Sequence, residues 1–503
     1  MGQRRKTGME FVEGVLGLDH GLIQLGLEPG DVVAISALNS DLYLEWLLAV
    51  AYVGGITAPF NYRWSLEEAR AALQVAKPTM LVHDATCNFW NFESFAGSVP
   101  SLRWQALMDT PSEVNSTKIR MITTEQLKIR FKGNLAADYL CAPQVAAIIC
   151  FTSGTTGRPK GVTISHSALV VQSLAKIAVV GYGEDDVCLS TMIIWMCIYT
   201  LHHIGGISSA LAMLMAGGCH ILLPKFEAKL AVESIDQHNV TSFITVPAMM
   251  ADLFSFYRTK HISVGSKCVK KVLNGAGGLS SDLIKNVIEI FPRAKLLSAY
   301  GMSHSYANSS NSAQKPDGIC VGKPAPHIEI RIAGDNSSSI GRILTRGPHV
   351  MLGYWDQMSN NNSSPTDECW LDTGDIEHID DCGNVWLIGR SRGRIKSGGE
   401  NVHPEEVSIQ TLMLLWSVAC TRLKDNWQWT DSSSNHPVCK NEHCLSSTVL
   451  QNFCRAKDLT GFKIPKNFVV WKNQFPVTTT GKLRRDQVRA VLMSYRQLPP
   501  SRL

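Results

Sequence analysis

Apolar runs alternate with amphipathic segments between about residues 30 and 300. Short runs rich in valine, isoleucine and leucine predict buried strands, and longer segments with apolar residues every three or four positions predict helices. The predicted strands cover residues 30–38, 79–84, 144–152, 240–246, 269–278 (with a turn at the end) and 294–301, and the predicted helices cover residues 40–55, 167–180, 247–257 and 280–291. Strands that are separated by helices indicate mostly parallel sheets covered on both faces.

The pattern changes after about residue 320. Short strands with glycine turns are predicted at residues 327–334, 341–347 and 384–390, which indicates a β-rich subdomain. The segment that follows, 389–401, is polar, basic and rich in glycine, as is typical of a hinge. We therefore expect an α/β fold with a large N-terminal domain over residues 1–389, a hinge at 390–393 and a small, mobile α+β domain over residues 394–503.

Composition narrows the possible functions. The 503 residues carry a formal charge of +5, and no basic run is interleaved with aromatics, so a nucleic-acid-binding face is not expected. The most apolar stretch, 192–201, is too short to span a bilayer. The 14 cysteines follow none of the zinc-binding spacings. We interpret the one loose cluster as ordinary thiols and imidazoles: Cys439, Cys444, Cys454, His436 and His443.

The densest candidate chemistry is "FTSGTTGRPKGVTISH", residues 151–166. Its glycines let backbone N–H groups approach a ligand, its hydroxyls donate hydrogen bonds, and Lys160 adds a positive charge. This composition predicts a phosphate-binding loop. The order of the residues differs from a Walker loop, in which Gly-Lys-Ser/Thr follows the first glycine after four residues. A P-loop kinase or ATPase is therefore excluded.

Two later segments carry weaker signals. In "WLDTGD", residues 370–375, the sequence predicts a turn that bears Asp372 and Asp375, and Arg390 ends a strand further on. A carboxylate and an arginine suit a ribose, but on these residues alone we favour a surface turn with an ion pair of little energetic value. Lys482, in "TTTGKLRRD", gains interest from its combination with the loop at residue 151.

Five motifs in order resemble those of the adenylate-forming enzymes, which include acyl-CoA synthetases, luciferases and the adenylation domains of peptide synthetases. The motifs are "FTSGTTGRPKG", "YGMS", "WLDTGD", "GRIKSGGENVHPEEV" and "TTTGKLRRD". Other segments, such as "NYRWSLEEA" and "ITVPAMMADL", resemble one branch of the family, the plant 2-succinylbenzoate–CoA ligases of phylloquinone synthesis. The resemblance covers nearly the whole chain.

The resemblance implies that the chain binds ATP, Mg²⁺ and a carboxylic acid, forms an acyl-adenylate, and transfers the acyl group to CoA after the C-terminal domain rotates. The residues expected to bind ATP are Thr152, Ser153, Gly154, Thr155, Thr156, Gly157, Lys160, Gly275, Ala276, Gly277, Tyr300, Gly301, Asp375 and Arg390. Among them, Tyr300 is expected to stack on adenine, and Asp375 and Arg390 to hold the ribose.

The remaining roles follow in the same way. Lys482 is expected to bridge the acyl carboxylate and the α-phosphate, with Ser303 at the α-phosphate and His304 at the metal. The expected hinge residue is Arg392. Residues expected to line the approach of the CoA thiol are Ser397, Gly398 and Gly399, and residues expected to border the acyl pocket are His203, Val246 and Pro247.

Several positions depart from the family pattern. Ser303 replaces the usual threonine, and His304 replaces a glutamate, which makes it a weak ligand for Mg²⁺. The segment 191–203 differs from the family, the strands expected after residue 407 are missing so that the C-terminal domain is shortened, and the chain starts late. These breaks suggest mis-joined exons or a decayed copy, a hypothesis that sequencing the full-length transcript tests.

The principal expectation is thus an acid–CoA ligase acting on 2-succinylbenzoate. A CoA ligase for another aromatic or medium-chain acid in peroxisomes, and a degenerate ATP-binding homologue with little activity, remain as alternatives. The C-terminal Ser501-Arg502-Leu503 is close to the peroxisomal Ser-Lys-Leu signal and predicts recognition by the peroxisomal import receptor. A longer form with a transit peptide would place the protein in chloroplasts as well.

Overall fold

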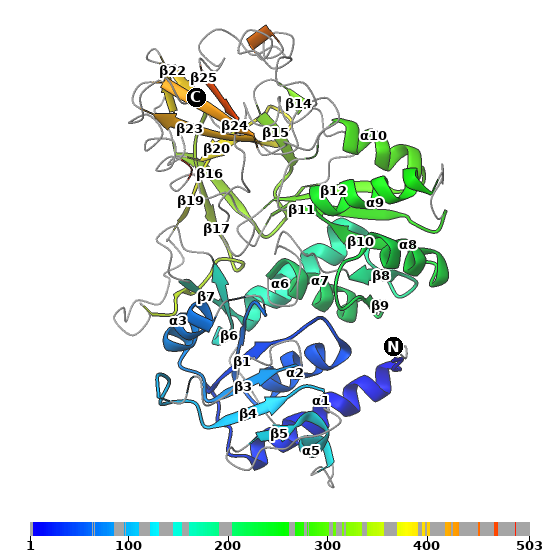
Figure 1. The fold of residues 1–503 in the computed structure, drawn as a ribbon, viewed down its shortest axis with the longest axis vertical. Helices are drawn as coiled ribbons and strands as arrows, with labels where there is room; N and C mark the ends of the chain where they lie inside the picture. Colours follow the sequence, from blue (N-terminus) through cyan, green and yellow to red (C-terminus); the bar gives the residue numbers. More distant parts are fainter. Residues whose placement is uncertain are drawn as a thin grey trace.

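The structure is a computed structural model of the chain. It describes residues 4–62, 64, 66–84, 95, 97–109, 121–129, 144–152, 160–190, 204–260, 267–275, 279, 281–300, 305–307, 314–315, 318–333, 340–356, 370–390, 395–397, 400–402, 418–423, 426–431, 451–452, 467–470 and 488. Two helix-covered sheets and one antiparallel sheet form most of this part, as Figure 1 shows.

The first sheet, sheet A, has eight strands in the order β18-β7-β6-β2-β1-β3-β4-β5. The strands from β6 to β5 in this order run parallel to their neighbours, and β7 and β18 pair antiparallel at one edge. Their bounds are β1 Val32–Ser36, β2 Ile56–Pro59, β3 Met80–His83, β4 Trp104–Leu107, β5 Met121–Thr123, β6 Ala146–Thr152, β7 Lys160–Ser165 and β18 Gly353–Tyr354.

Helices cover both faces of sheet A. Successive residues of each strand point to opposite faces, so both sets of side chains meet helices. Val33 and Ile35 pack with α1 (Gly8–Gln24), α2 (Asp41–Tyr52) and α5 (Thr124–Ile129), whereas Ala34 packs with α3 (Leu66–Ala76). This arrangement makes the central strands apolar throughout, as the sequence pattern predicted.

The second sheet, sheet B, has six strands in the order β13-β12-β11-β10-β8-β9, and only the β12–β13 pair is antiparallel. Helices α6 and α7 lie between sheets A and B (Figure 1), and α8, α9 and α10 cover the other face of sheet B. The bounds are β8 Val187–Ser190, β9 Cys219–Leu222, β10 Ser242–Thr245, β11 Lys271–Gly275, β12 Lys295–Tyr300, β13 Ser305–Ala307, α6 His166–Lys176, the π-helix η2 Ile177–Gly181, α7 Ile204–Met215, α8 Ala228–Gln237, α9 Pro247–Thr259 and α10 Ser281–Ile290.

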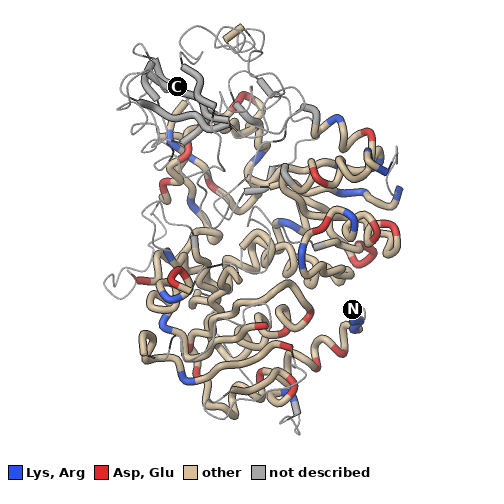
Figure 2. Tube along the Cα trace, in the orientation of Figure 1, with Lys and Arg blue, Asp and Glu red and all other residues tan. Residues whose placement is uncertain are grey.

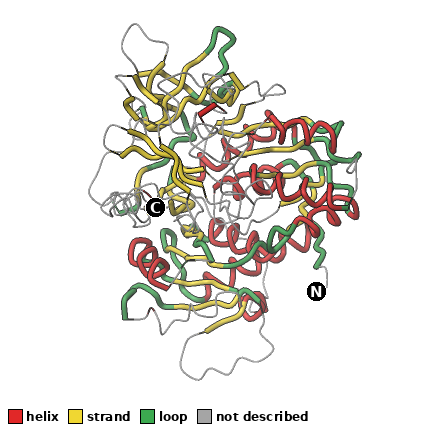
Figure 3. Tube along the Cα trace, turned by 45° about the horizontal axis from the view of Figure 1, so that its top comes forward, coloured by secondary structure: helices red, strands yellow, loops and turns green. Residues whose placement is uncertain are grey.

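The predicted β-rich subdomain is sheet C, whose six strands are all antiparallel in the order β14-β15-β20-β19-β17-β16. The chain around sheet C contacts both other sheets: β18 extends sheet A, and Tyr300 of β12 in sheet B packs against the apolar cluster of Val321, Ile343 and Val385 in sheet C. The bounds are β14 Gln314–Lys315, β15 Gly318–Gly322, β16 Glu329–Ala333, β17 Ile340–Arg346, β19 Leu371–Ile379 and β20 Val385–Arg390. In Figure 3 the helices gather around sheets A and B, whereas the region of sheet C consists mainly of strands.

Past residue 390 the described residues form two small sheets. The first pairs β21 (Ile395–Ser397) with β22 (Glu400–Val402), and the second contains β23 (Val418–Leu423), β24 (Asn426–Asp431) and β25 (Asn467–Val470). Strands therefore do follow residue 407, contrary to the expectation that they are missing. The fold class is that of the sequence analysis, whereas the hinge at 390–393 lies mostly outside the described residues. The division into domains therefore stays a prediction.

Local signals placed several elements correctly. Ser40 caps α2 by accepting a hydrogen bond from the Tyr43 backbone N–H, and the helix gives way to Gly54 with a φ of 80°. Pro247 begins α9, where its missing N–H costs no helical hydrogen bond. The turn predicted at residues 370–375 is wrong: Leu371–Asp375 belong to β19, and Gly374, with a φ of 73°, makes an irregularity inside the strand.

The described part of the chain contains no helix with the length and apolarity needed to cross a membrane.

Candidate functional site

The carboxyl ends of β11 and β12 lie side by side in sheet B and carry two of the predicted nucleotide-binding residues. The strands are parallel, with Gly275 opposite Ala299, and Tyr300 is the last residue of β12. Ligands of open parallel sheets bind beyond such strand ends. Gly275 and Tyr300 therefore lie at neighbouring strand ends, and their role in binding a nucleotide stays a prediction.

A hydrogen bond joins Tyr300 of sheet B to Asp375 of sheet C. The Tyr300 hydroxyl donates to Asp375 Oδ2 at 2.7 Å, and the Asp375 side chain is buried. Burial, followed by the charges of Glu377 and Asp375, raises the pKa of the Tyr300 hydroxyl well above its usual range. The hydroxyl thus keeps its proton and acts as a donor, which ties together two sheets that are distant in the sequence.

The backbone around Asp375 is held in place by its own strand. The Asp375 N–H donates to Thr373 Oγ1 at 3.2 Å, and the Thr373 hydroxyl donates to the Ile343 carbonyl at 3.0 Å. Across the sheet, Asp375 is the register partner of Arg390 in β20. The two residues predicted to hold the ribose are therefore cross-strand neighbours, although only the backbone of Arg390 is described.

Glu377 is a residue that the sequence analysis missed. Its side chain is fully buried, two positions after Asp375 in β19. Burial raises the pKa of Glu377 to about 8 and the nearby charge of Asp375 adds to the rise, whereas the proximity of the Tyr300 hydroxyl opposes it. The available signal was the two-residue period of a strand, which sets Glu377 beside Asp375 once "LDTGDIEHI" is read as a strand rather than a turn.

The predicted phosphate-binding segment lies between two adjacent strands of sheet A. Thr152 at the end of β6 pairs with Lys160 at the start of β7, so the loop 153–159 connects two adjacent strand ends. The ammonium of Lys160 lies over the ring of Tyr354 in β18, 5.4 Å from its centroid. The ring offers a cation–π contact that steadies this lysine at the base of the loop.

Two of the residues predicted to border the acyl pocket are described. Val246 follows β10 and is buried with Met249 and Met250 in the core between sheet B and its outer helices, and Pro247 begins α9. Both lie at the carboxyl end of β10, next to the ends of β11 in the sheet order. They stay candidates for the pocket wall.

The other predicted site residues lie outside the described residues. These are Ser153, Gly154, Thr155, Thr156, Gly157, His203, Ala276, Gly277, Gly301, Ser303, His304, Arg392, Gly398, Gly399, Lys482, Ser501, Arg502 and Leu503. Ser397 is described in its backbone only, within β21. The loosely clustered cysteines and histidines between 436 and 454 also fall outside.

Histidine, cysteine, aspartate and glutamate side chains, which commonly bind metals, occur throughout the described residues. Over that part of the chain, no group of three or more His, Cys, Asp or Glu side chains is placed to hold a metal ion. Charged residues of both signs are interspersed along the described chain, as Figure 2 shows. The described part of the chain therefore contains no complete metal site.

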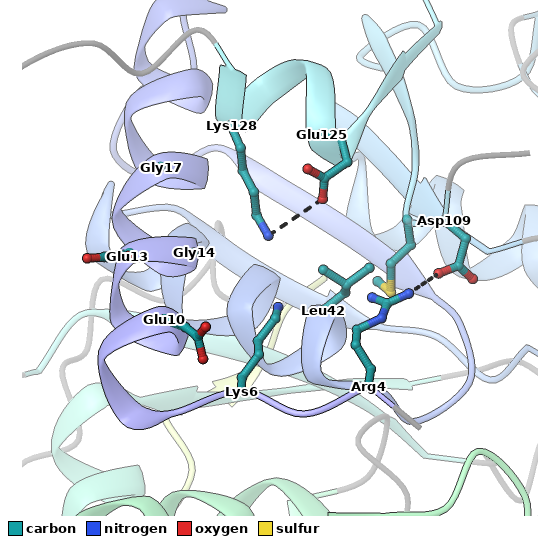
Figure 4. A pocket seen from close by; sticks show the side chains of 11 residues that line it. Arg4, Lys6, Glu10, Glu13, Gly14, Gly17, Leu42, Asp109, Glu125 and Lys128 are labelled. Atoms are coloured by element: carbon teal, nitrogen blue, oxygen red, sulfur yellow. Dashed lines mark ion pairs between the residues drawn. The ribbon is translucent and has the colours of Figure 1, made fainter. Parts of the chain in front are cut away.

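A separate pocket of 460 Å³ lies between α1, α2 and α5 and is lined by charges of both signs, including Arg4, Lys6, Glu10 and Lys128 (Figure 4). Next to it, Glu45 of α2 is fully buried between two lysines: Lys6 Nζ lies 2.5 Å from Oε1, and Lys128 Nζ lies 2.7 Å from Oε2. This pocket is in the helical layer of sheet A, away from the strand ends described above.

Comparison with known proteins gives the same result as the motifs. Residues 1–355 match the AMP-binding enzyme family. The chain is 50% identical to the chloroplastic/peroxisomal 2-succinylbenzoate–CoA ligase of Arabidopsis thaliana, over all of this chain and 95% of the relative. It is 28% identical to the indoleacetate–CoA ligase of Aromatoleum aromaticum, over 93% of this chain and 89% of that one.

Solved structures share the fold. An o-succinylbenzoate CoA synthetase from Bacillus subtilis, in complex with its acyl-adenylate, superposes with a TM-score of 0.76 at 23% identity, covering 97% of this chain and 93% of that one. An anthranilate CoA ligase bound to anthranoyl-AMP has a TM-score of 0.79 at 18% identity, covering 98% and 94%. This chain belongs to the AMP-binding enzyme family, as shown by the family match over residues 1–355 and by its whole-length similarity to a plant CoA ligase.

Proposed function

We propose that the protein is an acid–thiol ligase that converts 2-succinylbenzoate into 2-succinylbenzoyl-CoA, a step of phylloquinone synthesis. The carboxylate attacks the α-phosphorus of ATP and releases pyrophosphate, and the CoA thiol then displaces AMP from the acyl-adenylate. The 50% identity to the plant 2-succinylbenzoate–CoA ligase over the entire chain carries this proposal.

The nucleotide is proposed to lie across the carboxyl ends of β11 and β12 against sheet C. Asp375 and Arg390, cross-strand partners in β19 and β20, would hold the ribose, with the Tyr300 ring against adenine and Gly275-Ala276-Gly277 along its edge. The hairpin of β6 and β7 would direct residues 153–157 and Lys160 at the β- and γ-phosphates. A carboxylate suits the two ribose hydroxyls because it accepts hydrogen bonds with both oxygens.

Electrostatics explains the need for Lys482 and Mg²⁺. The substrate carboxylate and the triphosphate are both anions, so their repulsion must be offset before attack at phosphorus. Mg²⁺ would be held mainly by the phosphates of ATP, with His304 as a weak protein ligand and Ser303 at the α-phosphate. Lys482 would then neutralise the oxygens of the reacting carboxylate and the α-phosphate.

The second half-reaction needs a different set of residues. We propose that the chain pivots at Arg392 after adenylation, which withdraws Lys482 and brings Ser397, Gly398 and Gly399 to the path of the CoA thiol. His203, Val246 and Pro247 would border the acid. A mobile domain allows one nucleotide site to serve two reactions in turn.

The location is proposed to be peroxisomal, with chloroplasts as a second compartment for a longer form. The name of the plant relative gives both compartments. The Ser501-Arg502-Leu503 ending would be bound by the peroxisomal import receptor. A fluorescent fusion at the N-terminus, compared with the same fusion lacking the last three residues, tests the receptor signal.

The decisive assay incubates the purified protein with ATP, Mg²⁺, CoA and 2-succinylbenzoate and detects the thioester by mass. We expect thioester and AMP with this acid, and much less with indoleacetate or medium-chain acids. Faster turnover of another acid would favour the alternative of a peroxisomal ligase with different specificity. Binding of ATP without release of pyrophosphate would instead support a degenerate homologue, and His304→Glu, run in parallel, shows whether the metal position is the cause.

A further inference from the structure

Glu377 is the most unusual charged residue next to the nucleotide site. It lies in β19, in the centre of sheet C, with Gly341 of β17 and Leu387 of β20 as its register partners. Its side chain is fully buried, and neither carboxyl oxygen accepts a hydrogen bond from the described residues. A buried carboxylate without such partners is energetically costly, so its presence calls for a reason.

The ionisable groups around Glu377 are few in the described part of the chain. Tyr300 approaches from β12, and Asp375 lies two residues earlier on the same strand. The neighbouring cation on β17, Arg342, pairs with Asp372 at the exposed side of the sheet. His378, the next residue along, stacks on Trp386 instead. Glu377 therefore faces a hydroxyl and a carboxylate, and no described cation balances it.

A buried carboxyl group beside a second carboxylate resists ionisation. The Tyr300 hydroxyl donates its hydrogen bond to Asp375, at 2.7 Å, and no described hydrogen bond reaches the oxygens of Glu377. The pKa of Glu377 is accordingly raised to about 8. At neutral pH Glu377 therefore keeps its proton.

We propose that Glu377 is a positioning residue of the nucleotide site: as a neutral acid it supports the Tyr300–Asp375 pair, and on losing its proton it weakens nucleotide binding. The ionised carboxylate would compete with Asp375 for the Tyr300 hydroxyl. It would also add a second negative charge beside the site of an anionic ligand. This inference rests on the proposed function, because it needs Asp375 to bind a ribose.

The test measures the dissociation constants of adenosine and ATP by calorimetry between pH 6.5 and 9.5, for the wild type and Glu377→Gln. Adenosine carries no phosphate, so it isolates the ribose contact from phosphate repulsion. We expect the wild-type Kd for both ligands to rise above pH 8, by at most about tenfold per pH unit. The Kd of Glu377→Gln should stay flat, because the amide has the same shape and no proton to lose. Asp381→Asn, which removes an exposed carboxylate after β19, should behave as the wild type.

A second measurement needs no variant. If nucleotide binding favours protonated Glu377, adenosine binding to the wild type near pH 8 must take up protons, which calorimetry in buffers of different ionisation enthalpy detects. Equal pH profiles for wild type and Glu377→Gln, or no proton uptake by the wild type, would overturn this inference alone. Absence of any nucleotide binding would overturn the proposed function together with it.

Discussion

Glu45 in α2 and Glu377 in β19 are the same residue type and are both completely withdrawn from solvent, yet their surroundings are opposite. Glu45 is clamped by the ammonium groups of Lys6 and Lys128, beneath the first helical layer. Glu377 faces another carboxylate and a tyrosine hydroxyl. A carboxylate that only supports the fold is neutralised by nearby cations. Buried carboxyl groups with strongly shifted pKa values, such as Glu377, are instead typical of places where a ligand binds.

The largest effect is expected from removing the cations around Glu45. In a Lys6→Met, Lys128→Met double variant, Glu45 stays buried without these two counter-charges, as Glu377 is buried without a cation among the described residues. Breaking a buried ion pair in this way costs about 3–5 kcal/mol. Urea unfolding at neutral pH measures the loss. Lys229→Met, which disrupts an exposed pair with Glu233, is the control and should cost less than about 1 kcal/mol. A double variant that loses no more than this control would show that the clamp is unimportant.

The next effect concerns Lys482, which is proposed to neutralise the carboxylate of the substrate, whereas Lys6 and Lys128 neutralise a carboxylate of the protein. Lys482→Ala should slow adenylation by about 10²–10³, equivalent to roughly 2.7–4 kcal/mol of transition-state stabilisation, by analogy with the loss of an oxyanion donor. Acid-dependent exchange of pyrophosphate into ATP measures this step. The free energy of unfolding should stay within about 0.5 kcal/mol of the wild type. A near-normal exchange rate would refute the role given to Lys482.

A third prediction uses the raised pKa of Glu377. Between about 4.5 and 8 the folded protein holds a proton that the unfolded chain has lost, so the contribution of this group to the unfolding free energy falls as pH rises through that window. Glu377→Gln removes the term. The difference between the variant and the wild type should thus grow with pH by at most about 1.4 kcal/mol per unit and level off above pH 8. A constant difference across the window would mean that Glu377 ionises normally.

The smallest effect tests how closely Glu45 is packed. A methyl group on Gly14 of α1 would overlap Glu45 Oε1, so Gly14→Ala should destabilise the fold by about 1 kcal/mol even after the gain in helix propensity. Thermal unfolding measures the difference. Gly8→Ala, where a methyl group meets nothing within 4 Å, is the matched control and should be neutral or slightly stabilising. Equal shifts for the two variants would indicate that Glu45 moves freely.

Much of the fold could be predicted because its signals are local. The apolar strands of sheets A and B, the Ser40 cap and the Pro247 start depend on residues next to one another in the chain. The region around Asp375 was harder. Gly374 and the polar residues around it resemble a turn, whereas pairing with β17 and β20 holds the segment as a strand. Tertiary contacts overrode the local preference there.

The sequence alone determined the family, the order of the motifs and the ligase chemistry that they imply, because each motif is a contiguous run whose residue types suit phosphate, ribose or carboxylate. The roles given to residues 153–157, His304 and Lys482 remain predictions of that kind. Only the tertiary structure decided that the end of β12 meets β19, which brings the half-buried Tyr300 to the buried Asp375 and Glu377. No period along the chain encodes that contact, since it arises when two separate sheets pack together and exclude water from the groups between them.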